Sequence, residues 1–368
     1  MQEKSISEQT ARSVMSRYKT QDVRWHYEHG LVLQSIFLLG QRTEQEEYCS
    51  YVKTMFDAMI TSEGDILTYK EDEYNLDQIN SGKVLFLLHE KYGEEKYRIA
   101  IEKLREQLRN HPRTKTEGFW HKQIYPFQMW LDGLYMHGPF YTEYAKNYGC
   151  AADFKDIVHQ FTLIEEKARD SKTGLLYHAW DESKQMPWSN KETGCSPHFW
   201  GRALGWYCMA LVDAIELIPD SCPQEIEAVK AIAFRLLPPL LNFQDQTTGL
   251  WYQVLDKGGE EKNYLESSAS SMYVYFLLKL LRLGLVPDAD VESVKTAADK
   301  AFQGLLKHKI RREDSGELHL RDICKVAGLG GNPYRDGSYG YYVGETICED
   351  DFKGVGPFIL AAMEWEMQ

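Results

Sequence analysis

The chain has 368 residues, 43% of them hydrophobic and 26% charged, so it can bury a large core. Its formal net charge of −13 argues against a nucleic acid partner, because such partners require basic surfaces. No apolar run approaches the length of a membrane span, which argues against a membrane protein.

The seven cysteines are scattered and have no C-x-x-C spacing, and the charged N-terminus lacks the apolar stretch of a secretory signal. Together these features predict reduced thiols and a cytoplasmic location. No composition shift or linker divides the chain, so we expect a single domain over residues 1–368. Nothing in the sequence indicates the oligomeric state.

Apolar residues recur at spacings of three and four along nearly the whole chain, which predicts helices. We expect twelve of them. Their predicted ranges are 6–18, 25–40, 43–60, 76–91, 94–110, 128–147, 151–169, 196–218, 223–242, 264–283, 288–308 and 354–365.

The connections between these helices alternate between long and short after the third helix. Antiparallel helix pairs joined in this way place every long loop at one end of the molecule. Six such pairs predict an all-α (α/α)6 barrel, a six-hairpin toroid with inner and outer rings and an active site at the long-loop end.

One short internal sequence repeat supports a repeated structural unit. The stretch that begins at Asp170, DSKTGLLY, returns 75 residues later as DQTTGLWY. Asp-x-x-Thr-Gly is turn chemistry, so we expect these Asp residues to be structural. The residue after the repeat differs, His178 in one copy and Gln253 in the other, which marks His178 as the specialised position.

The most apolar stretch of the chain, YPFQMWLDGLYMHGPF, contains a single carboxylate, Asp132. A buried, unpaired carboxylate costs several kcal/mol unless it is protonated or receives a partner. The predicted helix around Asp132 is apolar on nearly every face, as expected of an inner helix. We therefore expect Asp132 to keep its proton more readily than in water, which suits proton transfer.

Other unusual polar residues fall near the starts of helices that follow long loops. Asp77 and Arg202 occupy such starts, while His121, Lys122 and His178 lie in the long loops themselves. The antiparallel pairing of the helices predicts that these five residues lie together at the long-loop end of the toroid. A structural alternative exists for each: Asp77 as a helix-dipole carboxylate, the His121–Lys122 pair as solvated loop, and Arg202 stacked on aromatic rings.

Other chemistries find little support. The sequence contains no P-loop, dinucleotide fingerprint, H-E-x-x-H motif or EF-hand pattern. His26 and His29 have helical spacing, but no third metal ligand is evident, so packing or capping is the favoured interpretation.

The strongest motifs resemble those of the unsaturated rhamnogalacturonyl hydrolases, glycoside hydrolase family 105, from about Trp25 to the C-terminus. A more distant resemblance is to the unsaturated glucuronyl hydrolases, family 88, which share the toroid. The motifs are NLDQINSGKVLFLL, YPFQMWLDGLYM, HAWDES, SPHFWGRALGW and DDFKGVGPFILAAME.

The resemblance implies that Asp132 is the catalytic general acid/base and that Asp77 is the second acidic residue of the cleft. It implies no cofactor and no metal. It assigns substrate-pocket positions to His121, Lys122, His178, Trp200 and Arg202.

The resemblance also implies an unusual reaction. Such enzymes hydrate the C4=C5 double bond that a polysaccharide lyase leaves on the non-reducing uronate, in place of direct attack at the anomeric carbon. The expected partner is thus a small anionic unsaturated oligosaccharide derived from pectin. Two alternatives stay open: an unsaturated glucuronyl hydrolase or relative that acts on another lyase product, and a non-catalytic toroid that binds oligosaccharide.

Overall fold

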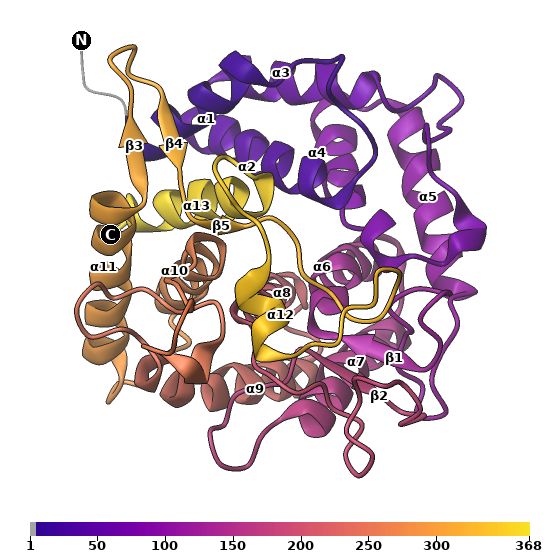
Figure 1. Ribbon diagram of the computed structural model, residues 1–368. Helices are drawn as coiled ribbons and strands as arrows, with labels where there is room; N and C mark the ends of the chain where they lie inside the picture. Colours follow the sequence, from indigo (N-terminus) through magenta and orange to yellow (C-terminus); the bar gives the residue numbers. More distant parts are fainter. Residues whose placement is uncertain (1–4) are drawn as a thin grey trace.

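Twelve long helices arranged as two concentric rings dominate the computed structural model, which describes residues 5–368 (Figure 1). This is the (α/α)6 toroid that the alternating loop lengths predict. The inner ring contains α2 (Tyr27–Thr43), α4 (Gly82–Tyr92), α6 (Leu131–Tyr148), α8 (Gly201–Leu217), α10 (Ser267–Arg282) and α13 (Phe352–Trp365). The outer ring contains α1 (Ile6–Arg17), α3 (Glu46–Asp57), α5 (Glu95–Arg109), α7 (Ala151–Ala168), α9 (Pro223–Asn242) and α11 (Val291–His308).

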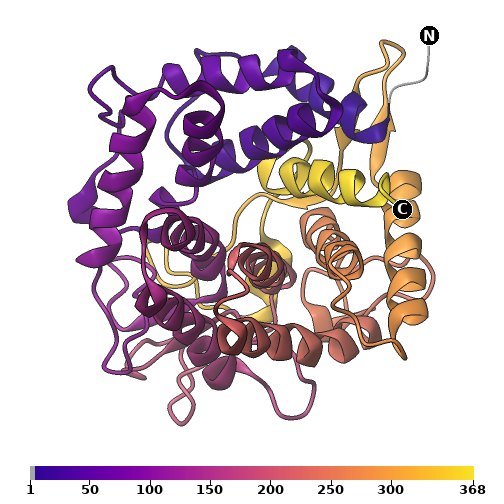
Figure 2. The same ribbon diagram turned by 180° about the vertical axis from the view of Figure 1, so that it is seen from behind.

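The inner helices contact one another in chain order, and α13 contacts α2 to close the ring. Each outer helix from α3 onward packs against the inner helix that precedes it, while α1 packs against α13. Seen from behind, the chain runs around the ring in the opposite sense, as expected of the reverse face (Figure 2). The two ends of the chain are joined directly, because Ser7 donates from its N–H and Oγ to the Glu366 carboxylate at 2.9 and 2.6 Å.

Sequence pattern separates the two rings. The inner helix α8 is buried at every position from Gly201 to Ile215, which fits its almost continuous apolar sequence. The outer helix α5 is amphipathic, and Tyr97, Ile101, Leu104 and Leu108 form its buried face. One hydrophobic cluster includes side chains from all twelve long helices.

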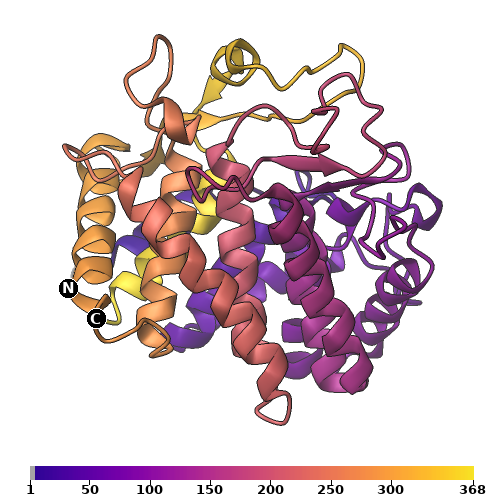
Figure 3. The same ribbon diagram turned by 90° about the horizontal axis from the view of Figure 1, so that it is seen from below.

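The long connections lie at one end of the toroid and the short turns at the other, as Figure 3 shows from the side. Three short antiparallel ladders and a short helix brace the long-loop end. They are β1 (Gln128–Trp130) with β2 (Ala179–Asp181), β3 (Ile310–Arg312) with β4 (Leu318–Leu320), β5 (Ile323–Cys324) with β6 (Ile347–Cys348), and α12 (Tyr339–Gly344). Within residues 5–368, no helix combines the length and the apolar character that crossing a membrane requires.

Several predicted helix starts were too early, and three of them lie at the site end of inner helices. The helices predicted from residues 76, 128 and 196 begin at Gly82, Leu131 and Gly201. The residues before them have partners outside their own helix: β1 pairs with β2, and Gly201 N–H donates to Gln253 C=O at 2.9 Å. Apolar spacing alone does not distinguish a short buried strand from the first turn of a helix.

Candidate functional site

A cavity of about 360 Å³ opens at the long-loop end of the toroid. The starts of inner helices form its floor, and the long loops form its walls. Four of the seven predicted site residues line it: Asp77, His121, Lys122 and Asp132. The structure therefore brings together side chains that are up to 55 residues apart in the chain.

Asp132 is positioned by the junction between β1 and α6. Trp130 pairs with Ala179 in the β1–β2 ladder, and Leu131 N–H then donates to His178 C=O at 3.0 Å. This junction places Asp132 in the first turn of α6 with its side chain 14% exposed, and Asp132 Oδ2 lies 3.1 Å from His178 Nε2. The two atoms are not aligned for a hydrogen bond, and neither has another partner in the described chain.

His178 lies behind Asp132 and is fully buried. Its Nδ1 is hydrogen-bonded to the Tyr342 hydroxyl at 2.7 Å, and its ring lies 4.8 Å from the Trp200 ring. These contacts fix the imidazole and direct Nε2 toward Asp132. His178 and Trp200 do not line the cavity, so their direct contact with substrate stays a prediction.

Asp77 belongs to an ion pair in the same cavity. It lies in a single 3₁₀ turn (Leu76–Gln78), which an isolated bridge between Asn75 and Lys122 holds against the next long loop. Lys122 Nζ is 2.6 Å from Asp77 Oδ2, and His121 Nε2 is 3.6 Å from Asp77 Oδ1.

The charges of this ion pair shift the pKa values in a consistent way. Burial opposes ionisation of Asp77, but Lys122 and His121 outweigh it and hold the pKa of Asp77 below its usual value. Burial also opposes the charge of Lys122, and Asp77 outweighs it to raise the pKa of Lys122. Burial lowers the pKa of His121 to about 4, so its ring is neutral at neutral pH.

Arg202 lies below the cavity and does not line it. Its side chain donates to Cys324 C=O and to Ser268 Oγ (3.3 Å), and its guanidinium carbon lies 5.0 Å from the centre of the Trp200 ring. The residue is 1% exposed, while its Nε and Nη2 have no partner among residues 5–368. Arg202 thus supports the base of the site, and its contact with the uronate also stays a prediction.

The cavity includes residues that our sequence reasoning did not select. Glu28 comes from α2, Lys353 from the first turn of α13, and Lys325 and Arg335 from the segment between β5 and α12. Lys353 could have been found, because it occupies the start of an inner helix after a long loop, as Asp132 does. Lys325 and Arg335 lie in irregular segments without such a signal.

The two histidines considered above as a weak metal pair have separate surroundings. His26 lines the cavity, and burial lowers its pKa. His29 is buried and hydrogen-bonded through Nδ1 to the Tyr18 hydroxyl.

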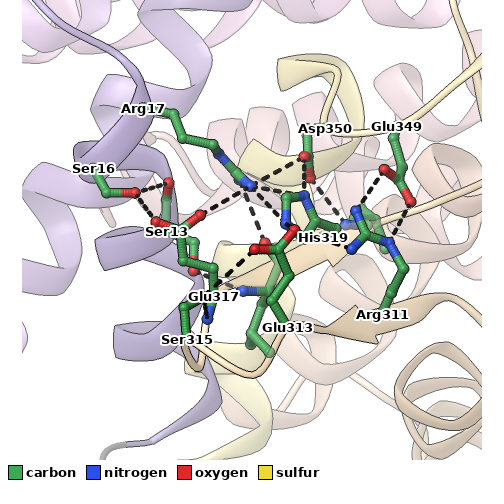
Figure 4. Close-up of polar contacts among 12 residues, drawn as sticks. Ser13, Ser16, Arg17, Arg311, Glu313, Ser315, Glu317, His319, Glu349 and Asp350 are labelled. Carbon is green, nitrogen blue, oxygen red and sulfur yellow. Dashed lines mark hydrogen bonds and ion pairs between the residues drawn. The ribbon is translucent and has the colours of Figure 1, made fainter.

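Acidic groups with metal-ligand spacing occur at another place, around His319 on β4 (Figure 4). Two arginines already occupy this cluster. Arg17 Nη1 lies 3.2 Å from Asp350 Oδ2, and Arg311 Nη2 lies 2.9 Å from Glu349 Oε2. These ion pairs connect α1 and β3 to the segment between β6 and α13, which gives the cluster a structural role.

The comparisons with known proteins agree with this architecture. A family model described as Glycosyl Hydrolase Family 88 matches residues 2–368. A solved Clostridium acetobutylicum structure, described as a glycoside hydrolase from family 105, is 47% identical. The match covers 99% of this chain and 100% of that one with a TM-score of 0.95.

Two further proteins are more distant. The Bacillus subtilis protein named unsaturated rhamnogalacturonyl hydrolase YesR is 28% identical over 70% of this chain and 71% of its own length. A solved unsaturated glucuronyl hydrolase from a Bacillus species is 14% identical with a TM-score of 0.67, over 98% of this chain and 94% of that one, and shares the fold.

Proposed function

The chain belongs to glycoside hydrolase family 105, within the larger group that the family 88 model covers, and from this premise we propose its substrate and mechanism. It is a glycoside hydrolase that acts on unsaturated uronate oligosaccharides. We propose that it removes the 4,5-unsaturated uronate from the non-reducing end of unsaturated galacturonyl-rhamnose, a product of pectin lyases. The name of the 28% identical relative supports rhamnose on the leaving side.

One observation supports Asp132 as the proton donor. Of the four acids that line the cavity, the other three each lie within 4 Å of a lysine: Asp77 of Lys122, and Glu28 and Asp351 of Lys353. Among the described residues Asp132 has no lysine or arginine that close. A neighbouring lysine stabilises an ionised carboxylate, and among the described acids of this cleft Asp132 is the one without such a partner, which supports it as the proton donor.

The proposed reaction begins with proton transfer from Asp132 to C4 of the uronate. The alkene electrons form the new C–H bond, and the positive charge is shared between C5 and the ring oxygen. A water molecule then adds to C5 while the Asp132 carboxylate takes its proton, which restores the acid. The resulting hemiketal opens to a ketone, and the neighbouring sugar leaves from C1 without a second acid.

The other cavity groups suit supporting roles in this scheme. The Lys122–Asp77 pair is ionised, so Asp77 can accept hydrogen bonds from a sugar hydroxyl or from the attacking water. His178 Nε2 lies 3.1 Å from Asp132 Oδ2, so the imidazole is near enough to influence the acid. Trp130, stacked on His121 with ring centres 4.5 Å apart, offers a flat wall for a sugar ring.

Defined unsaturated disaccharides test the proposal. We expect the ultraviolet absorbance of the conjugated enoate to disappear with unsaturated galacturonyl-rhamnose, and more slowly with unsaturated glucuronyl disaccharides. The reverse preference would support the second lyase-product class. Binding without any loss of absorbance would support a non-catalytic toroid.

Isotope labelling tests the chemistry separately from the substrate. In water enriched in ¹⁸O, hydration of the alkene places the label on C5 of the released uronate. Mass spectrometry should find it there. Label on the C1 oxygen would show direct attack at the anomeric carbon and would overturn the mechanism.

A further inference from the structure

The cations of the cleft divide into two groups. Lys122 is neutralised by Asp77 at 2.6 Å, and Lys353 lies between Glu28 and Asp351, with Nζ 2.8 Å from Asp351 Oδ1. Their positive charges are therefore already compensated within the protein.

Lys325 and Arg335 are different. Both line the cavity, and neither has a carboxylate within 4 Å in the part of the chain that the structure describes. The Lys325 side chain is exposed and makes no hydrogen bond there. Arg335 donates only to neutral groups, from Nε to Gly330 C=O (2.9 Å) and from Nη2 to the Tyr125 hydroxyl (3.0 Å) and Leu329 C=O (3.2 Å).

The loop is shaped around the Arg335 guanidinium. A Cβ atom at Gly328 would lie 2.3 Å from Arg335 Nη1, so a larger residue there would require the Arg335 guanidinium to move from this position. Tyr125, the partner of Nη2, stacks on Trp130 with ring centres 5.0 Å apart. Arg335 is thus held in place before any ligand arrives, and its Nη1 has no partner in residues 5–368.

The position of these two cations indicates which part of a ligand they meet. They lie in the segment between β5 and α12, which forms the outermost layer of the long-loop end (Figure 3). Asp132 and Asp77 lie deeper, near the starts of inner helices. In a protein with a net charge of −13, an anionic substrate needs local positive charge to enter.

We infer that Lys325 and Arg335 form an anion-binding arm at the mouth of the cleft that contacts an acidic group of the substrate. This inference rests on the proposed function, because it assumes an unsaturated uronate as ligand. Two sources could supply the anion: the carboxylate on C5 of the uronate itself, or an acidic sugar on the leaving side of a longer substrate, since rhamnose itself is neutral.

Steady-state kinetics of Lys325→Gln and Arg335→Lys test the inference on an unsaturated galacturonyl-rhamnose oligosaccharide that carries a further acidic sugar on its leaving side, so that both possible anions are present. Lys325→Gln removes one charge from an exposed side chain and should leave the fold intact. We expect its KM to rise about 3- to 10-fold, by more than any fall in kcat, and its kcat/KM to depend less on ionic strength. Arg335→Lys keeps the charge but loses the planar guanidinium with its fixed N–H donors. KM should therefore rise, while its dependence on ionic strength is retained.

Lys262→Gln is the matched control. Lys262 is an exposed lysine in another long loop and does not line the cleft. Its KM and salt dependence should equal those of the unaltered enzyme. If Lys325→Gln and Arg335→Lys behave as this control does, the inference is overturned.

Two further substrates identify the source of the anion. With the methyl ester of the uronate and a neutral leaving sugar, loss of the Lys325→Gln effect assigns the arm to the uronate carboxylate. With the ester and an acidic leaving sugar, persistence of the effect assigns it to the leaving side. An unaltered enzyme that consumes no unsaturated uronate refutes the proposed function, whereas normal turnover with unaffected variants refutes this inference alone.

Discussion

Four carboxylates line the cleft, and their nearest cations separate their roles. Asp77, Glu28 and Asp351 each have a lysine partner. Among the described residues, the ionisable neighbour of Asp132 is His178, whose Nε2 lies 3.1 Å from Asp132 Oδ2. A single titratable group in the right protonation state is enough for the proposed hydration, because the same oxygen gives and later regains the proton.

Asp132→Asn keeps the shape of the side chain and removes its acidity. We expect turnover to fall by about 10²- to 10⁴-fold with substrate binding retained, because general acid catalysis typically contributes that much. Enoate absorbance measures the first quantity and titration calorimetry the second. Asp220→Asn, at an exposed position, should change neither. More than a few per cent of residual activity would remove Asp132 from its role.

Lys122→Met tests the ionised state of Asp77. Lys122 helps to hold the pKa of Asp77 below its usual value, so its loss should raise that pKa. Asp77 then becomes protonated at a higher pH, and the acid limb of the profile of kcat/KM against pH should move upward by a similar amount. The exposed neighbour Lys115 gives the control, Lys115→Met. An equal loss of activity at every pH would show that Lys122 acts only through substrate binding.

The sequence located part of this site and missed the rest for a physical reason. Asp132 stands out because a carboxylate in an apolar stretch is costly, and Asp77 because it precedes an inner helix. Arg335 does not stand out, since its place depends on Gly328 in the same loop and on the distant Tyr125 hydroxyl. Such contacts between remote segments leave no periodic pattern.

At the scale of elements, the two copies of the Asp-x-x-Thr-Gly turn, at residues 170–174 and 245–249, show how the long loops return to the toroid. Asp170 Oδ2 accepts hydrogen bonds from Thr173 N–H and Oγ1, both at 2.8 Å, and Asp245 Oδ1 does the same for Thr248 at 2.7 Å. The correspondence between the two copies extends to residues 178 and 253, which both contact Tyr342. His178 is hydrogen-bonded to the Tyr342 hydroxyl, and Gln253 donates to Tyr342 C=O at 3.1 Å.

The glycines of these turns, Gly174 and Gly249, allow a direct comparison. Both have positive φ, 76° and 77°, so alanine at either position should cost about 1–2 kcal/mol of the free energy of unfolding. A Cβ at Gly249 would also lie 2.8 Å from the Lys300 carbonyl carbon, whereas at Gly174 its nearest contact is 3.3 Å, to Pro239 Cγ. Urea denaturation should therefore show Gly249→Ala to be the more destabilising, by about 1–3 kcal/mol. Equal losses would show that the Lys300 backbone moves aside freely.

At the scale of the whole molecule, closing six inner helices into a ring encloses charged groups as well as apolar ones. Lys83 of α4 is 5% exposed, and its Nζ lies 3.5 Å from the centre of the Tyr135 ring with no hydrogen-bond partner in residues 5–368. Burial lowers the pKa of Lys83 from 10.5 to about 7, although Asp213 acts in the opposite direction. A protonated Lys83 therefore opposes folding.

The sign of the resulting pH dependence is definite. Between pH 7 and 10.5 the unfolded chain holds a proton on Lys83 that the folded chain has lost, so stability from this group rises with pH. The fall in pKa corresponds to about 5 kcal/mol against folding at low pH, of which about 2–3 kcal/mol is recovered between pH 6 and 9. Lys83→Met should thus stabilise the protein more at pH 6 than at pH 9.

Urea denaturation of the two proteins at both pH values measures this difference. The variant Lys83→Arg keeps a charge that cannot be lost, so it should be less stable than the unaltered protein at pH 9. A stability gain for Lys83→Met that is the same at pH 6 and pH 9 would show that Lys83 does not titrate in this range.

The sequence by itself determined the twelve helices, their order in two rings and the end of the toroid that carries the site. Helical periodicity and loop length are local properties, and antiparallel pairing converts them into an arrangement in space. The acid in the apolar helix followed from the same local reasoning, since its cost is visible without any neighbour.

Only the tertiary structure decided which charges remain uncompensated. The lysine that neutralises Asp77, the tyrosine that orients His178 and the arginine at the mouth of the cleft come from segments joined by the closing of the ring. Electrostatic interactions fall off with distance and depend on burial, so they are set by the folded arrangement and not by position in the chain.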